Sequence, residues 1–272
     1  MSREINKDTR LCMSLAGRPG NFGTRFHNFL YQELDLNYIY KAFTTTDIQA
    51  AVGGVRALGI RGCAISMPFK ETCIPFLDEL DVSATAIESV NTIVNDDGFL
   101  RAYNTDYIAI AKLLSQYQVP TESTFMLRGN GGMAKAVVAA LRDAGFKHGH
   151  IIARNETAGK ALAENYGYQW QAEVGDLTAD MVINVTPIGM AGGAEAETLA
   201  FEPATIEQAK IVFDVVALPA ETPLIRYAQK HGKQVITGAE VIAIQAVEQF
   251  VLYTGVRPTD EQVERAAAHA RG

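Results

Sequence analysis

The segment Phe125-Met126-Leu127-Arg128-Gly129-Asn130-Gly131-Gly132-Met133-Ala134 decides the fold class of this chain. Its apolar beginning predicts a buried strand, and the Ala- and Val-rich segment 135–144 predicts a helix. The glycines between them have the spacing G-x-G-x-x-G/A, in which Gly129 makes the tight turn, Gly131 lets a pyrophosphate approach the backbone and Ala134 permits close packing of helix on strand. We therefore expect residues 129–134 to bind a dinucleotide, with its phosphates at the N-terminus of the helix, although a tight turn without a ligand would show the same spacing.

On both sides of this segment, apolar strand-like runs alternate with segments of helical period, which is typical of α/β proteins with largely parallel sheets. We expect strands at 10–16, 38–43, 63–67, 91–94 and 99–103, the last two joined by a hairpin turn, and then at 125–128, 150–153, 181–185, 211–216 and 234–237. Helices are expected at 24–34, 47–58, 70–80, 82–88, 107–117, 135–144 and 239–253, with a polar helix after Pro258. The sequence thus predicts a mixed sheet followed by a doubly wound parallel sheet.

Length and charge limit the domain count and the class of partner. The 272 residues, 48% of them apolar, are enough for two hydrophobic cores, so we expect two α/β domains. The net charge of −7 argues against nucleic acid or an anionic membrane surface, so a small-molecule substrate is expected. The sequence shows neither a membrane-spanning run nor a signal peptide, which predicts a cytoplasmic protein.

Cysteine and histidine give no sign of a metal site. Cys12, Cys63 and Cys73 form no C-x-x-C pair, and we expect them to be buried, unbridged thiols that fill apolar space. The five histidines are scattered and match no zinc-binding motif. No metal is therefore predicted.

The end of the second strand after the glycine turn separates NAD from NADP, because an acidic residue there bonds the ribose 2′-hydroxyl and repels a 2′-phosphate. Here the strand ends in Ala153-Arg154-Asn155. The planar guanidinium of Arg154 suits a phosphate, which favours NADP. Two alternatives stay open: Glu156 could bend back toward the ribose, or Arg154 could be a solvated charge at a strand end.

Polar side chains at strand ends in the first domain suggest proton transfer. Ser66-Met67-Pro68-Phe69-Lys70-Glu71 places a lysine after a buried strand, and Asn104-Thr105-Asp106 places a carboxylate after another. A lysine and a carboxylate that meet at a hydroxyl group suit proton transfer coupled to hydride transfer. From spacing alone, however, Lys70 could be solvated and Asp106 could cap the helix after it.

Several motifs, taken in chain order, resemble those of the shikimate dehydrogenase family. They are 66–71, Ser89-Val90-Asn91-Thr92, 104–106, 129–134, Asn184-Val185-Thr186-Pro187-Ile188-Gly189-Met190, Thr222-Pro223-Leu224, Gly238 and Gln245-Ala246. The resemblance implies a substrate domain at 1–105, completed by C-terminal helices at 239–272, and an NADP-binding Rossmann domain at 106–238. It also implies reversible reduction of 3-dehydroshikimate to shikimate, or of a related cyclic hydroxy acid, by a monomer or homodimer.

The same resemblance implies roles for single residues. Lys70 and Asp106 would be the catalytic pair, and Asn91 and Gln245 would bind substrate hydroxyl groups. Arg154 matches the arginine that binds the adenosine phosphate in the family. Asn184, Thr186 and Met190 would line the nicotinamide side of the cofactor site, with Gly238 beside it.

The sequence departs from the family pattern in substrate recognition. The family usually has a Ser-x-Ser pair shortly before an apolar-His step, and its hydroxyl groups bind the substrate carboxylate. Alignment on Phe26-His27 puts Asn21 and Gly23 at these substrate-binding positions. A tyrosine usually found after Asp214 is replaced by Ala217. The reaction class is therefore better supported than the substrate. Two alternatives stay open: a quinate or other cyclic polyol-acid dehydrogenase, and a non-catalytic NADP-binding sensor, although the presence of both Lys70 and Asp106 argues against the sensor. Another lysine-using dehydrogenase, such as one that acts on folates, is disfavoured by the Asn-Thr-Asp and Gln-Ala motifs.

Overall fold

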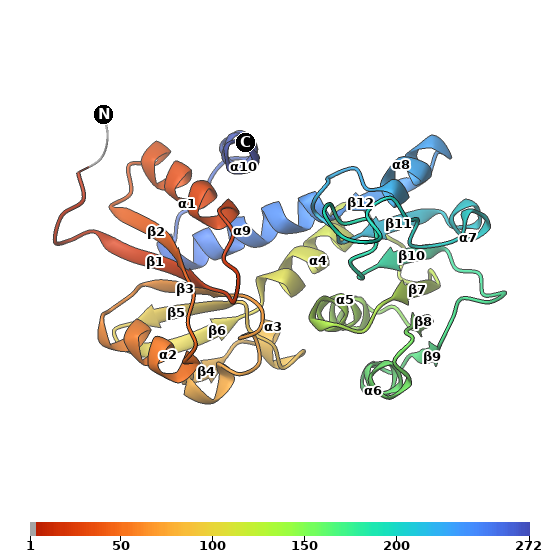
Figure 1. Cartoon of the computed structure of the whole chain (residues 1–272), viewed down its shortest axis with the longest axis horizontal. Coiled ribbons are helices and arrows are strands. Elements are labelled where there is room, and N and C mark those ends of the chain that lie inside the picture. Colours follow the sequence, from red (N-terminus) through yellow and green to blue (C-terminus); the bar gives the residue numbers. More distant parts are fainter. Residues whose placement is uncertain (1–3) are drawn as a thin grey trace. The chain divides into compact units, whose positions relative to one another are not determined.

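A computed structural model describes residues 4–272 (Figure 1). The first three residues of the polar N-terminal segment lie outside this range. The chain divides into two compact units. The first unit comprises the residues up to Thr105 together with Ala243–Gly272, and the second comprises Asp106–Ile242.

The first unit contains a mixed sheet with strand order β2-β1-β3-β5-β6-β4. Its strands are β1 (Arg10–Leu15), β2 (Tyr38–Phe43), β3 (Gly62–Ile65), β4 (Glu79–Leu80), β5 (Thr92–Asp96) and β6 (Phe99–Tyr103). β1 lies between β2 and β3 and runs parallel to both, whereas β5 is antiparallel to β3 and β6. The predicted hairpin is confirmed, because Asp97 and Gly98 connect β5 to β6 with positive φ angles of 51° and 94°.

Helices cover both faces of this sheet. On one face lie α1 (Phe22–Glu33), α9 (Gly238–Thr254) and α10 (Asp260–Arg271), whose apolar side chains pack with those of β1 and β2 in one core. Figure 1 shows α1 and α10 side by side. On the other face, α2 (Ile48–Ala57) and α3 (Val82–Thr85) pack over a second core. Asp47 caps α2 as predicted, since its side chain accepts a hydrogen bond from the backbone N–H of Ala50.

The helix predicted at 70–80 is wrong. This segment forms turns, a short 3-10 helix at Ile74–Phe76 and the edge strand β4. Pro75 cannot continue a helix that begins at Lys70, because it removes a backbone donor. Hydrogen bonds to β6 hold the end of this segment in an extended conformation. The Asp78 N–H donates to the carbonyl of Leu100, and the Asp78 carboxylate accepts from the Leu100 N–H at 2.7 Å.

The second unit contains a fully parallel sheet with strand order β12-β11-β10-β7-β8-β9. Its strands are β7 (Phe125–Arg128), β8 (Gly149–Ile152), β9 (Gln169–Gln171), β10 (Met181–Asn184), β11 (Ile211–Asp214) and β12 (Gln234–Thr237). The helices of this unit are α4 (Thr105–Gln116), α5 (Gly132–Asp143), α6 (Glu156–Tyr166), α7 (Pro203–Gln208) and α8 (Pro223–Lys230), followed by the start of α9. This is the predicted doubly wound arrangement, in which ligands bind where the strand order reverses, here between β7 and β10. The short polar edge strand β9 was not predicted.

The three cysteines are buried free thiols, as predicted. Burial raises the pKa of Cys12 to about 12, so its thiol is unreactive near neutral pH. Within residues 4–272, no group of three or more His, Cys, Asp and Glu side chains is placed to hold a metal ion. The same part of the chain has no helix with the length and apolarity required to cross a bilayer.

Candidate active site

Lys70 lies at the edge of the first sheet where β1 and β3 end and β5 begins. It stands in a turn and is half-buried. Its backbone carbonyl accepts a hydrogen bond of 2.8 Å from the N–H of Val90, and the carbonyl of the next residue, Asn91, accepts one of 2.8 Å from Ile65. The structure therefore brings the backbone of Lys70 next to Val90, the residue that precedes Asn91.

Asn91 is 3% exposed, and both ends of its carboxamide bond to Thr105. Its Oδ1 accepts from the Thr105 N–H at 2.8 Å and from the Thr92 hydroxyl at 2.8 Å. Its Nδ2 donates to the Thr105 hydroxyl oxygen at 3.0 Å. These bonds join the beginning of β5 to the beginning of α4, although the residues lie 14 positions apart.

Gln245 and Gln249 extend this network from α9. The Thr105 hydroxyl group donates to Gln245 Oε1 at 3.3 Å. One turn further along α9, Gln249 Nε2 donates to the backbone carbonyl of Asn91 at 3.2 Å and to the Thr92 hydroxyl at 3.0 Å. Sequence reasoning singled out Gln245 but missed Gln249, Thr92 and Thr105, since a side chain that holds another side chain has no motif of its own.

Asp106 follows Thr105 directly, in the first turn of α4, and is 8% exposed. Because α4 already begins at Thr105, Asp106 lies inside the helix and is not its N-cap. An acidic residue is favourable at this end of a helix, where the macrodipole is positive. Asp106 is thus a nearly buried acidic residue that directly follows Thr105 along the chain.

Asn21 and Gly23 lie at the start of α1. Asn21 is exposed and occupies the N-cap position. Gly23 faces β2, where a Cβ atom added to it would lie 3.5 Å from the hydroxyl oxygen of Tyr40, an ordinary contact distance. The loop before them starts next to the Lys70 turn, because the Gly17 N–H donates to the carbonyl of Met67 at 2.8 Å.

The glycine turn has the geometry that its sequence predicts. It follows β7, and Gly129 adopts a φ of 123°, where a Cβ would also approach Val185 Cγ2 to 2.8 Å. Gly131 is the N-cap of α5, and among the described residues no heavy atom beyond the adjacent residues and the backbone of the helix itself lies within 4 Å of a Cβ added to Gly131 or Gly132. Ala134 is fully buried against the sheet. The start of α5 thus has open space beside Gly131 and Gly132, and a helix N-terminus of this kind favours an anion such as a pyrophosphate.

Arg154 is exposed just after β8, and Asn155 follows it as the N-cap of α6. Glu156, the residue that could have turned toward a ribose, bonds instead to Lys160 one turn further along α6, at 2.7 Å. The guanidinium is therefore the charged group presented at the end of β8. These residues fit the adenosine end of NADP.

Asn184 and Thr186 are held by bonds within the second unit. Asn184 is completely buried, and its Nδ2 donates to the carbonyl of Ile188 at 3.1 Å and to Asp214 Oδ1 at 3.0 Å. Its Oδ1 accepts from the N–H and the hydroxyl group of Thr186, at 3.0 Å and 2.6 Å. The buried Asn184 side chain therefore holds the loop after β10 in place through its bonds to Thr186 and Ile188. Met190, at the end of the same loop, is 43% exposed.

Asp214 is the buried charge at the centre of this second network, and sequence reasoning did not assign it a role. Besides Asn184, its carboxylate accepts from the Val216 N–H at 3.1 Å and from the Thr222 hydroxyl at 2.6 Å. Burial raises the pKa of Asp214 to about 6, although the three hydrogen bonds oppose the shift. One carboxylate thus ties together the loops after β10 and β11 and the start of α8.

Gly238 begins α9 and packs directly on a neighbouring loop. A Cβ at this position would clash with the backbone of Val215 and Val216. Close packing alone therefore requires a glycine here, whether or not a cofactor lies beside it.

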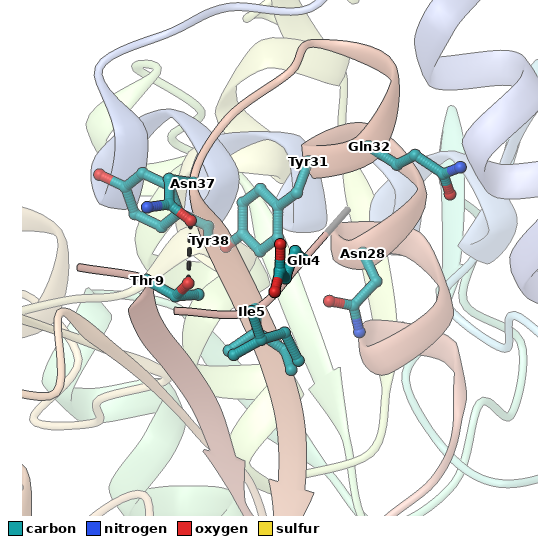
Figure 2. Close-up of a pocket in the computed structure, with 9 residues that line it drawn as sticks. Glu4, Ile5, Thr9, Asn28, Tyr31, Gln32, Asn37 and Tyr38 are labelled. Atoms are coloured by element: carbon teal, nitrogen blue, oxygen red, sulfur yellow. Dashed lines mark hydrogen bonds between the residues drawn. The ribbon is translucent and has the colours of Figure 1, made fainter. Parts of the chain in front are cut away.

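A small cavity of about 250 Å³ lies elsewhere in the first unit (Figure 2). The N-terminal segment forms one side of it with Glu4 and Ile5, and α1 and β2 form the others. Across its rim the Thr9 hydroxyl donates to Asn37 Oδ1 at 2.9 Å. The residues that line this cavity include none of the predicted site residues.

Comparisons with known proteins agree with this architecture. A family model described as the shikimate dehydrogenase substrate binding domain matches residues 22–93. A shikimate dehydrogenase-like protein from Haemophilus influenzae is 63% identical over 267 residues, which cover 98% of both chains. A shikimate dehydrogenase (NADP(+)) from Pelodictyon phaeoclathratiforme is 34% identical over 269 residues, covering 93% of this chain and 94% of the relative. A crystal structure of a shikimate dehydrogenase in complex with NADP+ superposes with a TM-score of 0.85 at 29% identity, covering 97% of this chain and 96% of the other.

The fold and the two groups of side chains define a two-unit α/β protein whose second unit is of the Rossmann type. With the relatives above, the assignment becomes more specific. The chain belongs to the shikimate dehydrogenase family.

Proposed function

We propose that this protein is an NADP-dependent oxidoreductase that interconverts a cyclic hydroxy acid, shikimate or a close relative, and the corresponding ketone. The observation that carries the proposal is the series of hydrogen bonds that joins the backbone of Lys70 to Val90, and the side chain of Asn91 to Thr105, at one end of the first sheet. Asp106 is the next residue along the chain, and Gln245 joins through Thr105.

The proposed catalytic pair is Lys70 and Asp106. When the ketone is reduced, its oxygen must gain a proton, and when the alcohol is oxidised, the hydroxyl group must lose one. Lys70 would exchange this proton with the substrate oxygen, and Asp106 would hold the hydroxyl group and tune the acidity of the lysine. Asn91 and Gln245 would orient the ring through its other hydroxyl groups.

The proposed cofactor site comprises the turn at 129–134, Arg154, the loop with Thr186 and Met190, and Gly238. When bound, the nicotinamide of NADP supplies or accepts the hydride. The open space at Gly131 and Gly132 and the exposed guanidinium of Arg154 support this assignment. Asn184, which is buried, would act only by holding Thr186 in place.

The test is the change in nicotinamide absorbance when the protein is mixed with NADP and a panel of cyclic hydroxy acids that includes shikimate and quinate. We expect NADP to be reduced with at least one member of the panel, and NAD to be reduced more slowly. A protein that binds NADP but reduces it with no member of the panel would instead be a non-catalytic sensor.

A second candidate, a dehydrogenase whose preferred ring differs from shikimate, is favoured by Asn21 and Gly23. These residues replace the hydroxyl groups of the family's carboxylate-binding pair, and Ala217 replaces an aromatic side chain. Quinate, which carries an additional hydroxyl group near its carboxylate, is the first alternative that the panel should resolve.

A further inference from the structure

The contacts of Asn91 fix which end of its carboxamide is the oxygen. The N–H of Thr105 can only donate, so the atom that it reaches at 2.8 Å must be Oδ1. That oxygen also accepts from the Thr92 hydroxyl at 2.8 Å, which uses its second lone pair. The other end of the amide, Nδ2, therefore faces the Thr105 hydroxyl oxygen at 3.0 Å and donates to it.

The position of the single Thr105 hydroxyl proton follows from the same reasoning. Asn91 Oδ1 lies 3.1 Å from the Thr105 hydroxyl oxygen, but it already accepts two hydrogen bonds. The remaining acceptor within reach is Gln245 Oε1, at 3.3 Å. The Thr105 proton therefore goes to Gln245, which turns the carbonyl end of Gln245 toward Thr105 and its amino end away.

We propose that Thr105 is a positioning residue whose hydroxyl group, by accepting from Asn91 and donating to Gln245, sets both carboxamides so that they present N–H groups to the substrate. This inference rests on the proposed function, because it takes Asn91 and Gln245 as residues that bind substrate. Thr105 itself is completely buried and acts only through these two side chains.

The direction of the two amides limits which groups of a ligand can bind to them. A substrate that meets two amide donors must offer oxygen atoms that accept hydrogen bonds, as ring hydroxyl, carbonyl and carboxylate groups do. A protonated amino group at either position has no lone pair and would be rejected. The direction of the amides would thus select for an oxygen-rich ring.

The experiment compares Thr105→Val, which keeps the shape of the side chain but removes the hydroxyl group, with Thr105→Ser, which keeps the hydroxyl group. We expect Thr105→Val to raise the KM for shikimate about tenfold or more, as loss of one oriented hydrogen bond would. The value of kcat should change less, NADP affinity should stay at the parental value, and Thr105→Ser should restore most of the loss. Thr254→Val is the matched control, since it removes a hydroxyl group that bonds only within α9 and the residues after it.

A second readout needs no turnover. Nitrogen-15 NMR spectra resolve the side-chain amide protons of Asn91, and their exchange with solvent should quicken in Thr105→Val but not in Thr105→Ser or Thr254→Val. Unchanged exchange and KM in Thr105→Val would overturn the proposal, and so would equal damage in the Val and Ser variants, which would assign the effect to packing. If the parent oxidised no ring acid at all, the proposed function would fail, while the amide exchange would still decide the role of Thr105.

Discussion

At the scale of single residues, the proposed proton transfer depends first on Lys70 and Asp106. Replacing Lys70 with Ala should lower kcat about 10²-fold or more, the usual contribution of a positioned acid–base group, and should leave NADP affinity nearly unchanged. Asp106→Asn should act in the same way. The measurement is steady-state turnover at saturating NADP.

Lys41→Ala is the matched control, because Lys41 is an exposed lysine of β2 in the same unit. Near-parental turnover in both the Lys70 and the Asp106 variants would show that the catalytic pair is wrongly assigned. Equal losses in Lys70→Ala and Lys41→Ala would point to a general effect of charge.

Arg154 carries the prediction on cofactor choice. A charge-assisted bond to a phosphate contributes about 1.5–3 kcal/mol, so Arg154→Ala should weaken NADP binding by about one to two orders of magnitude while NAD binding barely changes. Titration of both cofactors against the variant checks this. Arg226→Ala, on α8 of the same unit, serves as the control. If NADP and NAD lost affinity equally, Arg154 would support the fold or the adenine and not the 2′-phosphate.

The residues proposed to contact substrate or cofactor could be predicted from the sequence, whereas the residues that hold them in place could not. The glycine turn and Arg154 stand in short local patterns whose meaning depends only on the neighbouring strand and helix. Asp214 and Asn184 lie 30 positions apart, and nothing in either local sequence predicts that they are bonded. The same holds for Thr105 and Gln245, which lie 140 positions apart.

At the scale of elements, strands bounded by turn residues were predicted well and the segment after Lys70 was not. β2, β7 and β12 have the predicted bounds, since each is a short apolar run between polar or glycine-containing turns. The segment 70–80 has a helical spacing of apolar residues, but that spacing also fits turns that cover a core. Pro75 and the bonds of Asp78 to Leu100 decide between the two, and only the first of these is visible in the sequence.

Asp214, at the end of β11, leads to a prediction of how the stability of the folded protein depends on pH. Because burial raises the pKa of Asp214 to about 6, the folded protein holds this proton more tightly than the unfolded chain, in which the pKa has its usual value near 4. Between about pH 4 and pH 6 the folded state therefore carries more protons, and its stability falls as the pH rises. Asp214→Asn should remove this dependence. Between pH 5 and pH 7 the parent should lose about 1–2 kcal/mol more of its unfolding free energy than the variant does.

Chemical denaturation of the parent and the variant at both pH values measures this difference. Asp180→Asn is the control, because the hydrogen bond from Lys210 is the main reason that the pKa of Asp180 is only about 2, so its carboxylate is ionised throughout this range. Equal losses in the parent and Asp214→Asn would mean that the Asp214 carboxylate is not perturbed in the folded protein.

At the scale of the whole molecule, membership in the family does not determine which substrate is preferred. The chain matches shikimate dehydrogenases over nearly its whole length, yet Asn21 and Gly23, at the positions where the resemblance predicts the carboxylate-binding hydroxyl groups, carry none. Two lost bonds to a charged group would cost about 3–6 kcal/mol, or roughly 10²–10⁴ in kcat/KM. We therefore expect shikimate to be oxidised slowly, and a substrate that differs at the carboxylate end or near Ala217 to be preferred.

The double variant Asn21→Ser with Gly23→Ser should raise kcat/KM for shikimate. Both changes fit the fold, because serine is a favoured N-cap residue and a Cβ at position 23 meets Tyr40 at an ordinary distance. A parental kcat/KM of ~10⁴ M⁻¹s⁻¹ or more would refute the idea, since that is the ordinary range for enzymes on their own substrates. A double variant without any gain would refute it as well.

The most direct test of the central claim, hydride transfer that depends on Lys70, follows the hydride itself. NADPH labelled with deuterium at the transferable position is incubated with 3-dehydroshikimate and the protein, and the product is analysed by mass spectrometry. We expect the parent and Lys41→Ala to form shikimate that carries one deuterium atom. Lys70→Ala should form it about 10²-fold more slowly or not at all. Bound NADPH that transfers no deuterium to this ketone or to related ketones, or transfer that is equally fast in Lys70→Ala, would contradict it.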